Sequence, residues 1–159
     1  MRGILPWIAA AVVIIADRIT KGMVMDRIEP GSWIEVVPGF ALTHILNRGI
    51  AFSLFAGGGP LTRILLHLII FTSVVIIAAM VVRHGHHSRF GGLAFGLILG
   101  GAIGNLIDRV LYGAVVDFVH LWVKDFNVAD ASITVGAILL IANEFRYTHS
   151  GMDDAPDPD

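Results

Sequence analysis

Four long apolar segments constrain this chain more than any other feature of its sequence. They run over residues 4–25, 61–82, 90–111 and 128–145. A helix needs roughly 20 mostly apolar residues to cross a bilayer, so each segment predicts a membrane-spanning helix. Charged residues make up 15% of the chain, whereas soluble domains carry about 25%. So short a chain cannot bury this much apolar surface in its own core, and we expect lipid to cover much of it.

The two ends of the chain call for separate interpretations. The apolar run after Met1-Arg2 is similar to a secretory signal, but its A-x-A pattern, Ala9 to Ala11, lies inside the run rather than after it. We therefore expect a retained first helix and one domain over residues 1–150. Residues 151–159 carry four aspartates and two prolines, which predicts a disordered acidic tail.

The connections between the segments differ in character. Residues 26–60 contain two β-prone runs, Trp33–Val37 and Phe40–Leu46, on either side of Pro38-Gly39. This pattern predicts a small hairpin outside the membrane. Residues 112–127 are partly apolar, and we expect this segment to lie along the membrane interface.

Connectivity alone gathers the acidic residues at one membrane boundary. Asp17 is late in the first apolar segment, Asp108 is late in the third, Asp130 is early in the fourth, and Asp117 lies in the loop between the last two. Four alternating spans place all of these positions on the same side. The balance of Lys and Arg between the two sides, which usually sets orientation, does not assign this face to a compartment.

Asp117 and Asp130 form the most informative pair. Asp117 lies in the apolar run Val115–Phe118, and Asp130 follows 13 residues later at a helix start. Two carboxylates brought close together cannot both ionise easily, so one keeps a proton. The ionised member can then activate water while the other protonates a departing amine. The alternative is that Asp130 is a helix N-cap and Asp117 a turn residue, and spacing alone leaves both interpretations open.

Other polar residues of this boundary carry similar alternatives. Asn127 can cap the fourth helix or orient a catalytic carboxyl. Asp17 and Lys21 are spaced i, i+4, so they share one helix face and can pair. The alternative for these two residues is a polar helix end that reaches the membrane surface.

Small residues recur every four positions along the third apolar segment, at Gly92, Gly96, Gly100 and Gly104. Such spacing lets membrane helices approach closely, so the glycines predict helix packing. This packing would bring Asn105, Asp108 and Arg109 against neighbouring helices.

Several other kinds of chemistry have little support in the sequence. The chain has no cysteine, which removes disulfides, thiolate zinc sites and a cysteine nucleophile. Its net charge of −2 provides no basic field for nucleic acid. His84, His86 and His87 lie in the short polar loop 83–89 on the side opposite the acids, where a titratable surface is a simpler interpretation than a metal site.

Taken in order, five motifs resemble those of the lipoprotein signal peptidase (signal peptidase II) family. The resemblance covers nearly the whole chain, and five motifs in order are far more specific than any one of them. The motifs are Asp17-x-x-x-Lys21, Asn47-x-Gly49-x-Ala51-Phe52-Ser53, Gly100-Gly101-Ala102-x-Gly104-Asn105-x-x-Asp108-Arg109, Val115-Val116-Asp117-Phe118, and Phe126-Asn127-x-Ala129-Asp130-x-x-Ile133-Thr134-x-Gly136.

The resemblance implies an aspartic endopeptidase of the bacterial inner membrane. It would cut the signal peptide from diacylglyceryl-modified prolipoproteins just before the lipidated cysteine. Asp117 and Asp130 match the catalytic pair of the family. The positions that match its supporting or substrate-contacting residues are Asp17, Lys21, Asn47, Gly49, Asn105, Asp108, Arg109 and Asn127.

The family also implies an architecture and a set of partners. The expected fold is all-α, with four transmembrane helices plus a small antiparallel β-sheet and an interfacial helix on the extracytoplasmic side. Both termini would be cytoplasmic and the active site periplasmic. The chain would act as a monomer among membrane lipids, need no metal or organic cofactor, bind no nucleic acid, and be inhibited by globomycin-type antibiotics.

Three positions depart from the family pattern. Arg18 stands where glutamine is usual, and Arg48 and Ile50 replace small residues of the second motif. The arginines can favour anionic lipid headgroups. A small proton-coupled transporter is the alternative function, but a transporter would hold polar groups near the midplane or on both sides. The inner half of each span has almost none, which favours an enzyme at the interface.

Overall fold

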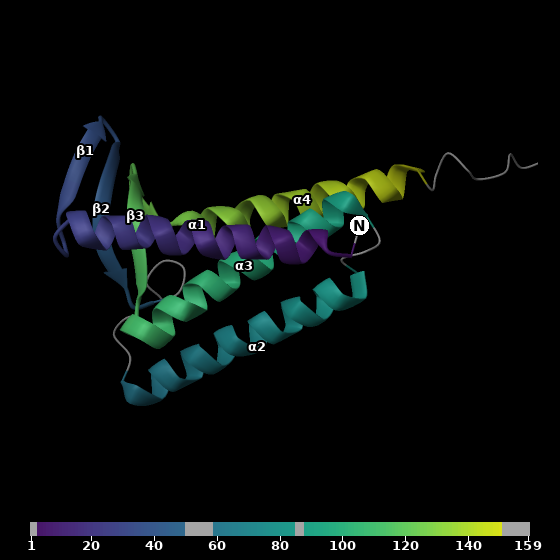
Figure 1. Ribbon diagram of the computed structural model, residues 1–159, viewed down its shortest axis with the longest axis horizontal. Helices are drawn as coiled ribbons and strands as arrows, with labels where there is room; N and C mark the ends of the chain where they lie inside the picture. Colours follow the sequence, from purple (N-terminus) through teal and green to yellow (C-terminus); the bar gives the residue numbers. More distant parts are fainter. Residues whose placement is uncertain (1–2, 50–58, 85–87, 151–159) are drawn as a thin grey trace, which may run out of the picture.

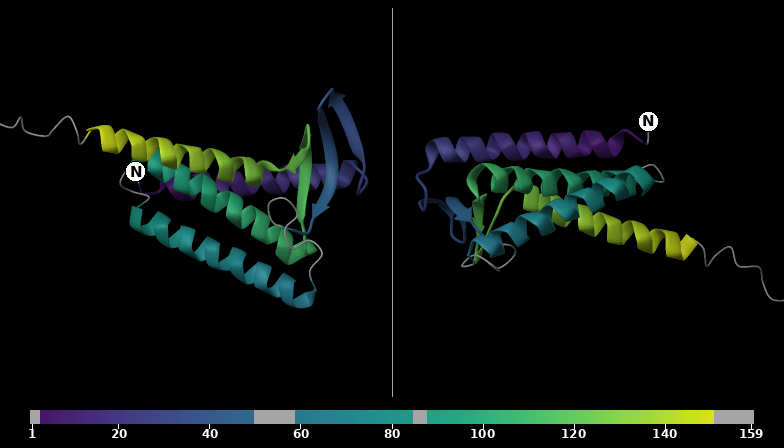
Figure 2. Two further views of the ribbon diagram at one scale, coloured as in Figure 1. Left: turned by 180° about the vertical axis from the view of Figure 1, so that it is seen from behind. Right: turned by 90° about the horizontal axis from the view of Figure 1, so that it is seen from below.

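The computed structural model describes residues 3–49, 59–84 and 88–150, which form four helices and four strands (Figure 1). Both views of Figure 2 show the strands at one end of the helical bundle and the N-terminus at the other end. The elements are α1 (Leu5–Arg27), β1 (Trp33–Val37), β2 (Phe40–Asn47), α2 (Pro60–His84), α3 (Arg89–Tyr112), β3 (Val115–Leu121), β4 (Lys124–Phe126) and α4 (Val128–Ser150).

Helix α3 lies at the centre of the bundle and packs against the other three helices. Helix α2 packs mainly on α3 (Figure 1). One core cluster forms where Ala10 of α1, Val81 of α2 and Leu99 of α3 meet. The bundle therefore has a single central helix through which the others are held together.

The predicted packing role of the glycine row is confirmed for α1 and α3. A Cβ atom on Gly96 would overlap the carbonyl oxygen of Pro6, and one on Gly100 would lie 2.7 Å from that of Ala10. Gly101 allows a similar close approach between α3 and α4, because a Cβ atom on it would overlap the carbonyl oxygen of Ala129 in α4. These approaches leave no room for a side chain between the helices.

Three helices among the described residues are long and apolar enough to cross a membrane. They are α2 from Ile64 to His84, α3 from Arg89 to Tyr112, and α4 from Val128 to Phe145. The prediction of four spans is therefore not confirmed for α1. The reason is chemical, because the second half of α1 carries Asp17, Arg18 and Lys21.

The strands form one antiparallel sheet in the order β1-β2-β3-β4. The predicted hairpin is confirmed, with Gly39 in the left-handed region (φ 82°) at its turn. The segment expected to lie along the interface, residues 112–127, contributes β3 and β4 to this sheet. The helices of the described ranges are the four named above, so the interfacial helix is not confirmed. The acidic tail, His86, His87 and Ile50 lie outside the described residues.

Candidate active site

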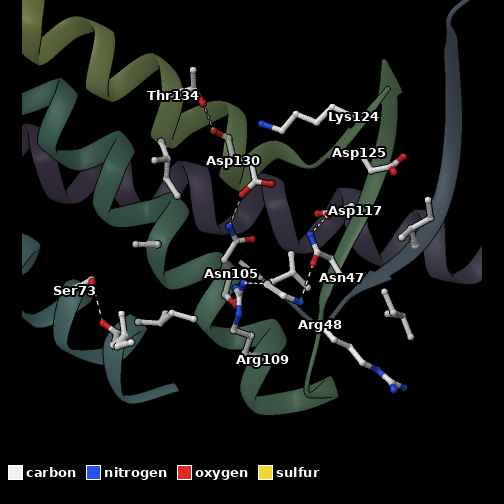
Figure 3. Close-up of a pocket in the computed structure, with 18 of the residues that line it drawn as sticks. Asn47, Arg48, Ser73, Asn105, Arg109, Asp117, Lys124, Asp125, Asp130 and Thr134 are labelled. Atoms are coloured by element: carbon white, nitrogen blue, oxygen red, sulfur yellow. Dashed lines mark hydrogen bonds between the residues drawn. The ribbon is translucent and has the colours of Figure 1, made fainter. Parts of the chain in front are cut away.

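The predicted site residues meet where the sheet joins the helical bundle (Figure 3). Asp117 lies on β3, where it pairs with Ile45 of β2. Asp130 lies in the first turn of α4. Asn47 is the last residue of β2, and Asn105 projects from α3. Four separate elements thus supply the polar groups of one site.

Asn127 fulfils both roles that its position in the sequence allows. Its Oδ1 accepts a hydrogen bond from the backbone N–H of Asp130 at 2.9 Å, directly before α4 begins. This contact makes Asn127, rather than Asp130, the N-cap of α4. The side-chain amide of Asn127 also donates to Oδ1 of Asp117 at 2.7 Å. One residue therefore starts the helix that carries one aspartate and holds the carboxylate of the other.

Asp117 is 1% exposed, and both of its carboxylate oxygens accept hydrogen bonds. The second donor is Nδ2 of Asn47, at 3.0 Å from Oδ2. Burial raises the pKa of Asp117 to about 6, and the charge of Asp130 acts in the same direction, against the two amide donors. Desolvation of the carboxylate outweighs the hydrogen bonds that favour its ionised form.

Asp130 is partly buried, and Nδ2 of Asn105 donates to its Oδ1 at 2.6 Å. Asp117 and Asp130 both line one open cavity of about 1020 Å³. The helices contribute apolar side chains to the same cavity, among them Ile69, Ile70 and Ile133. The cavity is therefore lined by polar and apolar side chains together, and both the sheet and the helices contribute to each kind.

Arg109 connects the site to the chain that follows β2. One guanidinium nitrogen donates to the carbonyl oxygen of Gly49 at 3.0 Å, and another donates to that of Asn105 at 3.3 Å. The backbone N–H of Gly49 in turn donates to Oδ1 of Asn47 at 3.0 Å. The arginine thus fixes the position of the asparagine that holds Asp117.

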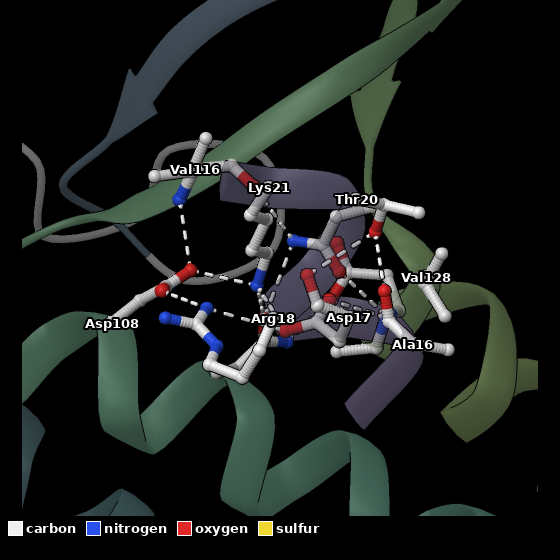
Figure 4. Close-up of polar contacts among 12 residues, drawn as sticks. Ala16, Asp17, Arg18, Thr20, Lys21, Asp108, Val116 and Val128 are labelled. Carbon is white, nitrogen blue, oxygen red and sulfur yellow. Dashed lines mark hydrogen bonds and ion pairs between the residues drawn. The ribbon is translucent and has the colours of Figure 1, made fainter. Parts of the chain in front are cut away.

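Asp17, Lys21 and Asp108 form a buried ion cluster (Figure 4). The ammonium of Lys21 lies 2.7 Å from a carboxylate oxygen of Asp17 and 2.7 Å from one of Asp108, and all three side chains are 0% exposed. Lys21 also donates to Oδ1 of Asn105 at 3.3 Å. The alternative of a helix end that reaches the membrane surface is wrong for these residues, because they point into the protein.

The structure also brings residues to the site that the sequence did not single out. Arg18, noted only as a departure from a family pattern, pairs with Asp108. Arg48, Lys124 and Asp125 line the cavity. Arg48, like Arg18, was noted only as a departure from the family pattern, and Lys124 and Asp125 belong to none of the five motifs. Within the described ranges, no group of three or more His, Cys, Asp or Glu residues could hold a metal ion.

The apolar helices and the paired carboxylates together define a membrane-embedded protein with a candidate acid–base site. The comparisons with known proteins agree with this class. Residues 9–146 match the family model of signal peptidase (SPase) II. The chain is 41% identical to the lipoprotein signal peptidases of Burkholderia thailandensis and Paraburkholderia phymatum over 147 residues, which cover 89% of this chain and 88% of each relative.

Two solved structures have the same fold. A bacterial membrane enzyme determined by the in meso method at 2.3 Å resolution aligns with a TM-score of 0.82 and 28% identity, over 97% of this chain and 93% of the other. A second such enzyme, at 1.9 Å resolution, aligns with a TM-score of 0.75 and 30% identity, over 87% and 90%. The chain belongs to the signal peptidase II family, and it is therefore a membrane-embedded protease.

Proposed function

We propose that this protein is an aspartic endopeptidase that removes the signal peptide from diacylglyceryl-modified prolipoproteins, just before the lipidated cysteine. The observation that carries the proposal is the pair of carboxylates in one cavity, with Asn47 and Asn127 on Asp117 and Asn105 on Asp130. Membership of the signal peptidase II family and likeness to lipoprotein signal peptidases support the substrate class.

The two aspartates take different roles in the proposed reaction. Asp117, whose pKa burial raises to about 6, is the member that holds a proton. A bound peptide displaces water from the cavity and favours this protonated form further. Asp130 acts as the general base.

The chemistry then follows from these two roles. Asp130 takes a proton from a water molecule, whose oxygen attacks the scissile carbonyl carbon while Asp117 donates to the carbonyl oxygen. A tetrahedral intermediate forms. Its C–N bond breaks as Asp130 passes its proton to the cysteine nitrogen and a hydroxyl of the intermediate returns a proton to Asp117, and the signal peptide leaves with a new carboxyl group. The step uses one water molecule and no metal or organic cofactor.

The apolar side chains that line part of the cavity suit a substrate that is anchored in lipid. Ile69 and Ile70 of α2 and Ile133 of α4 line its apolar part. We place the apolar signal segment and the acyl chains along this wall, with the scissile bond beside the dyad. Globomycin-type inhibitors would occupy the same cavity. The enzyme acts as a monomer in the bacterial inner membrane, with its site at the periplasmic face and both termini cytoplasmic.

Purified protein in detergent, incubated with a diacylglyceryl-modified prolipoprotein, tests this proposal. We expect one cut, and mass spectrometry of the product should find the lipidated cysteine at its new N-terminus. The same precursor without the diacylglyceryl group should remain mostly intact. A precursor left intact by the wild-type protein, or cut at another bond, would contradict the proposed activity.

A further inference from the structure

A lysine in the cavity of the dyad has no charged partner among the described residues. Lys124 lines the cavity together with Asp117 and Asp130. Figure 3 shows its side chain extending from β4 across the cavity toward Asp130 at the start of α4. Lys124 is exposed, and within the described ranges it forms no ion pair. Its ammonium is therefore available to an anionic group that enters the cavity.

The charged side chains closest to this description have partners within the protein. Oδ1 of Asp125, the next residue in the chain, lies 2.9 Å from Nδ1 of His120 on β3. Arg109 is 9% exposed, and its guanidinium donates to two backbone carbonyl oxygens. Both groups are thus already bonded inside the protein, unlike the ammonium of Lys124.

Arg48 also lines the cavity, but it belongs to the other end of β3. It follows Asn47, which pairs with Val115, whereas Lys124 pairs with Leu121 at the far end of the same strand. An extended strand of this length spans about 20 Å. The two cations therefore do not form one cluster, and their effects on a bound substrate can be separated by substitution.

The proposed path of the substrate leads past Lys124. In Figure 3, Ser73 of α2 lies on one side of Asp130 and Lys124 lies on the other. The proposed function places the signal segment and the acyl chains along the apolar side chains that include Ile69 and Ile70 of α2. With the scissile bond at the dyad, the peptide that follows the cysteine then continues toward β4. An acidic side chain in this peptide would meet the ammonium of Lys124.

We propose that Lys124 is a specificity-determining residue, which binds the carboxylate of an acidic side chain in the first residues after the lipidated cysteine. The proposal rests on the peptidase function proposed above. A lysine ammonium is a compact charge on a flexible stem with three donors, so it can reach a carboxylate at more than one position. Lys124 should therefore favour precursors that carry an acid close to the cut.

The test is a double-mutant cycle between the purified, full-length enzyme and its precursor, in nonionic detergent at low ionic strength. One diacylglyceryl-modified precursor carries aspartate at the two positions after the cysteine, and its counterpart carries asparagine there. Successive side chains of an extended peptide point to opposite sides, so one aspartate faces Lys124 in either orientation. The measured quantity is the ratio of kcat/KM for the acidic precursor to that for the neutral one, because this ratio cancels effects common to both precursors.

K124Q should lower this ratio about three- to fivefold relative to wild type, which is the size expected for an ion pair at a solvent-accessible site. K124E should lower it further, whereas K124R keeps the charge and should keep the ratio close to that of wild type. Added salt should shrink the difference between wild type and K124Q, because it screens exposed charges.

Arg27→Gln is the matched control, because this exposed arginine lies in the last turn of α1 and is not among the residues that line the cavity. It should show the wild-type ratio. An unchanged ratio in K124Q and K124E would overturn the proposal. An equal fall in R48Q would also overturn it, because the effect would then come from the general positive potential of the cavity.

A lipid headgroup is the other anion that could meet this lysine, and the same assay distinguishes it. Phosphatidylglycerol added to the detergent would then speed cleavage of both precursors by wild type but not by K124Q, with no difference in their ratios, and this result would overturn the proposal. A wild-type protein that cuts neither precursor would count against the peptidase function rather than against the role of Lys124.

Discussion

At the scale of single residues, the environment of Asp117 matters most for the proposed chemistry, because it sets the pKa of this carboxyl. Two amide groups donate to its carboxylate, which favours ionisation, while burial favours the protonated form. Burial is the larger effect and raises the pKa to about 6. Asp117 is therefore poised to exchange a proton near neutral pH, as a general acid must be.

The raised pKa of Asp117 predicts how activity depends on pH. The acid form of Asp117 is present below about pH 6 and is lost as pH rises through that value. If this form is required, kcat/KM for the free enzyme should decline about tenfold per pH unit on the alkaline side. Cleavage rates at low precursor concentration, from pH 5 to pH 8.5, measure this limb. A flat profile over that range would show that Asp117 does not act as the acid.

The sequence identified the residues of the candidate site better than the contacts between their side chains. The spacing of Asn127 and Asp130 allowed Asn127 to be a cap or a carboxylate partner, and the structure shows both contacts. The role of Arg18 could not be predicted, because its main partner, Asp108, is 90 residues away. Charge pairs across that distance leave no periodic signal in a single sequence.

At the scale of secondary structure, the close packing of α3 sets the geometry of the site. Gly101 faces Ala129 at the start of α4, so the separation of these helices positions Asp130 against Asn105. The row of glycines that packs on α1 was visible in the sequence because it repeats every four residues. Gly101 lies outside this row, and its contact with α4 was not visible, because it depends on which helix lies opposite.

Replacing Gly101 with alanine tests this dependence. The new Cβ would overlap the carbonyl oxygen of Ala129, so α3 and α4 must move apart. We expect a loss of about 1 to 3 kcal/mol in stability and at least a tenfold loss of cleavage activity. Thermal unfolding in detergent and the cleavage assay measure the two effects.

Gly22→Ala is the control for this change, since a Cβ at Gly22 of α1 meets no atom within 4 Å. It should keep both stability and activity. Wild-type behaviour of the Gly101 variant would show that the contact between α3 and α4 does not set the geometry of the site.

The strands were predicted unevenly, for a physical reason. The runs that form β1 and β2 are separated by a Pro-Gly turn, so their pairing was visible. The first four residues of β3, Val115 to Phe118, are all buried. A strand that is buried on both faces lacks the alternation that identifies strands. Its partner β4 has only three residues, and the pair was therefore interpreted as an irregular interfacial segment.

At the scale of the whole molecule, the polar residues of the site gather at the end of the bundle that carries the sheet (Figure 1). The order of the apolar segments along the chain predicted this gathering, because alternating spans return to the same side. The orientation in the membrane was not predictable in the same way, because the basic residues divide between the two sides without a clear excess. Several of them, such as Arg109, belong to the candidate site.

Single-cysteine labelling can determine this orientation, because the natural chain contains no cysteine. Val123 in the turn between β3 and β4 is 93% exposed, and Arg83 is exposed at the far end of α2. If the site is periplasmic, Val123→Cys should react with a membrane-impermeant maleimide in right-side-out vesicles. Arg83→Cys should react only in inverted vesicles, and the opposite pattern would place the site in the cytoplasm.

The most direct test of the whole account is the rate at which the two dyad variants cleave a diacylglyceryl-modified prolipoprotein. Asp117→Asn and Asp130→Asn should each lower kcat by about a thousandfold or more, while both proteins remain folded and inserted in the membrane. Asp26→Asn, an exposed change near the end of α1, should match wild type. Full activity in either dyad variant, or loss of activity in the Asp26 variant, would contradict the assignment of Asp117 and Asp130 as the catalytic pair.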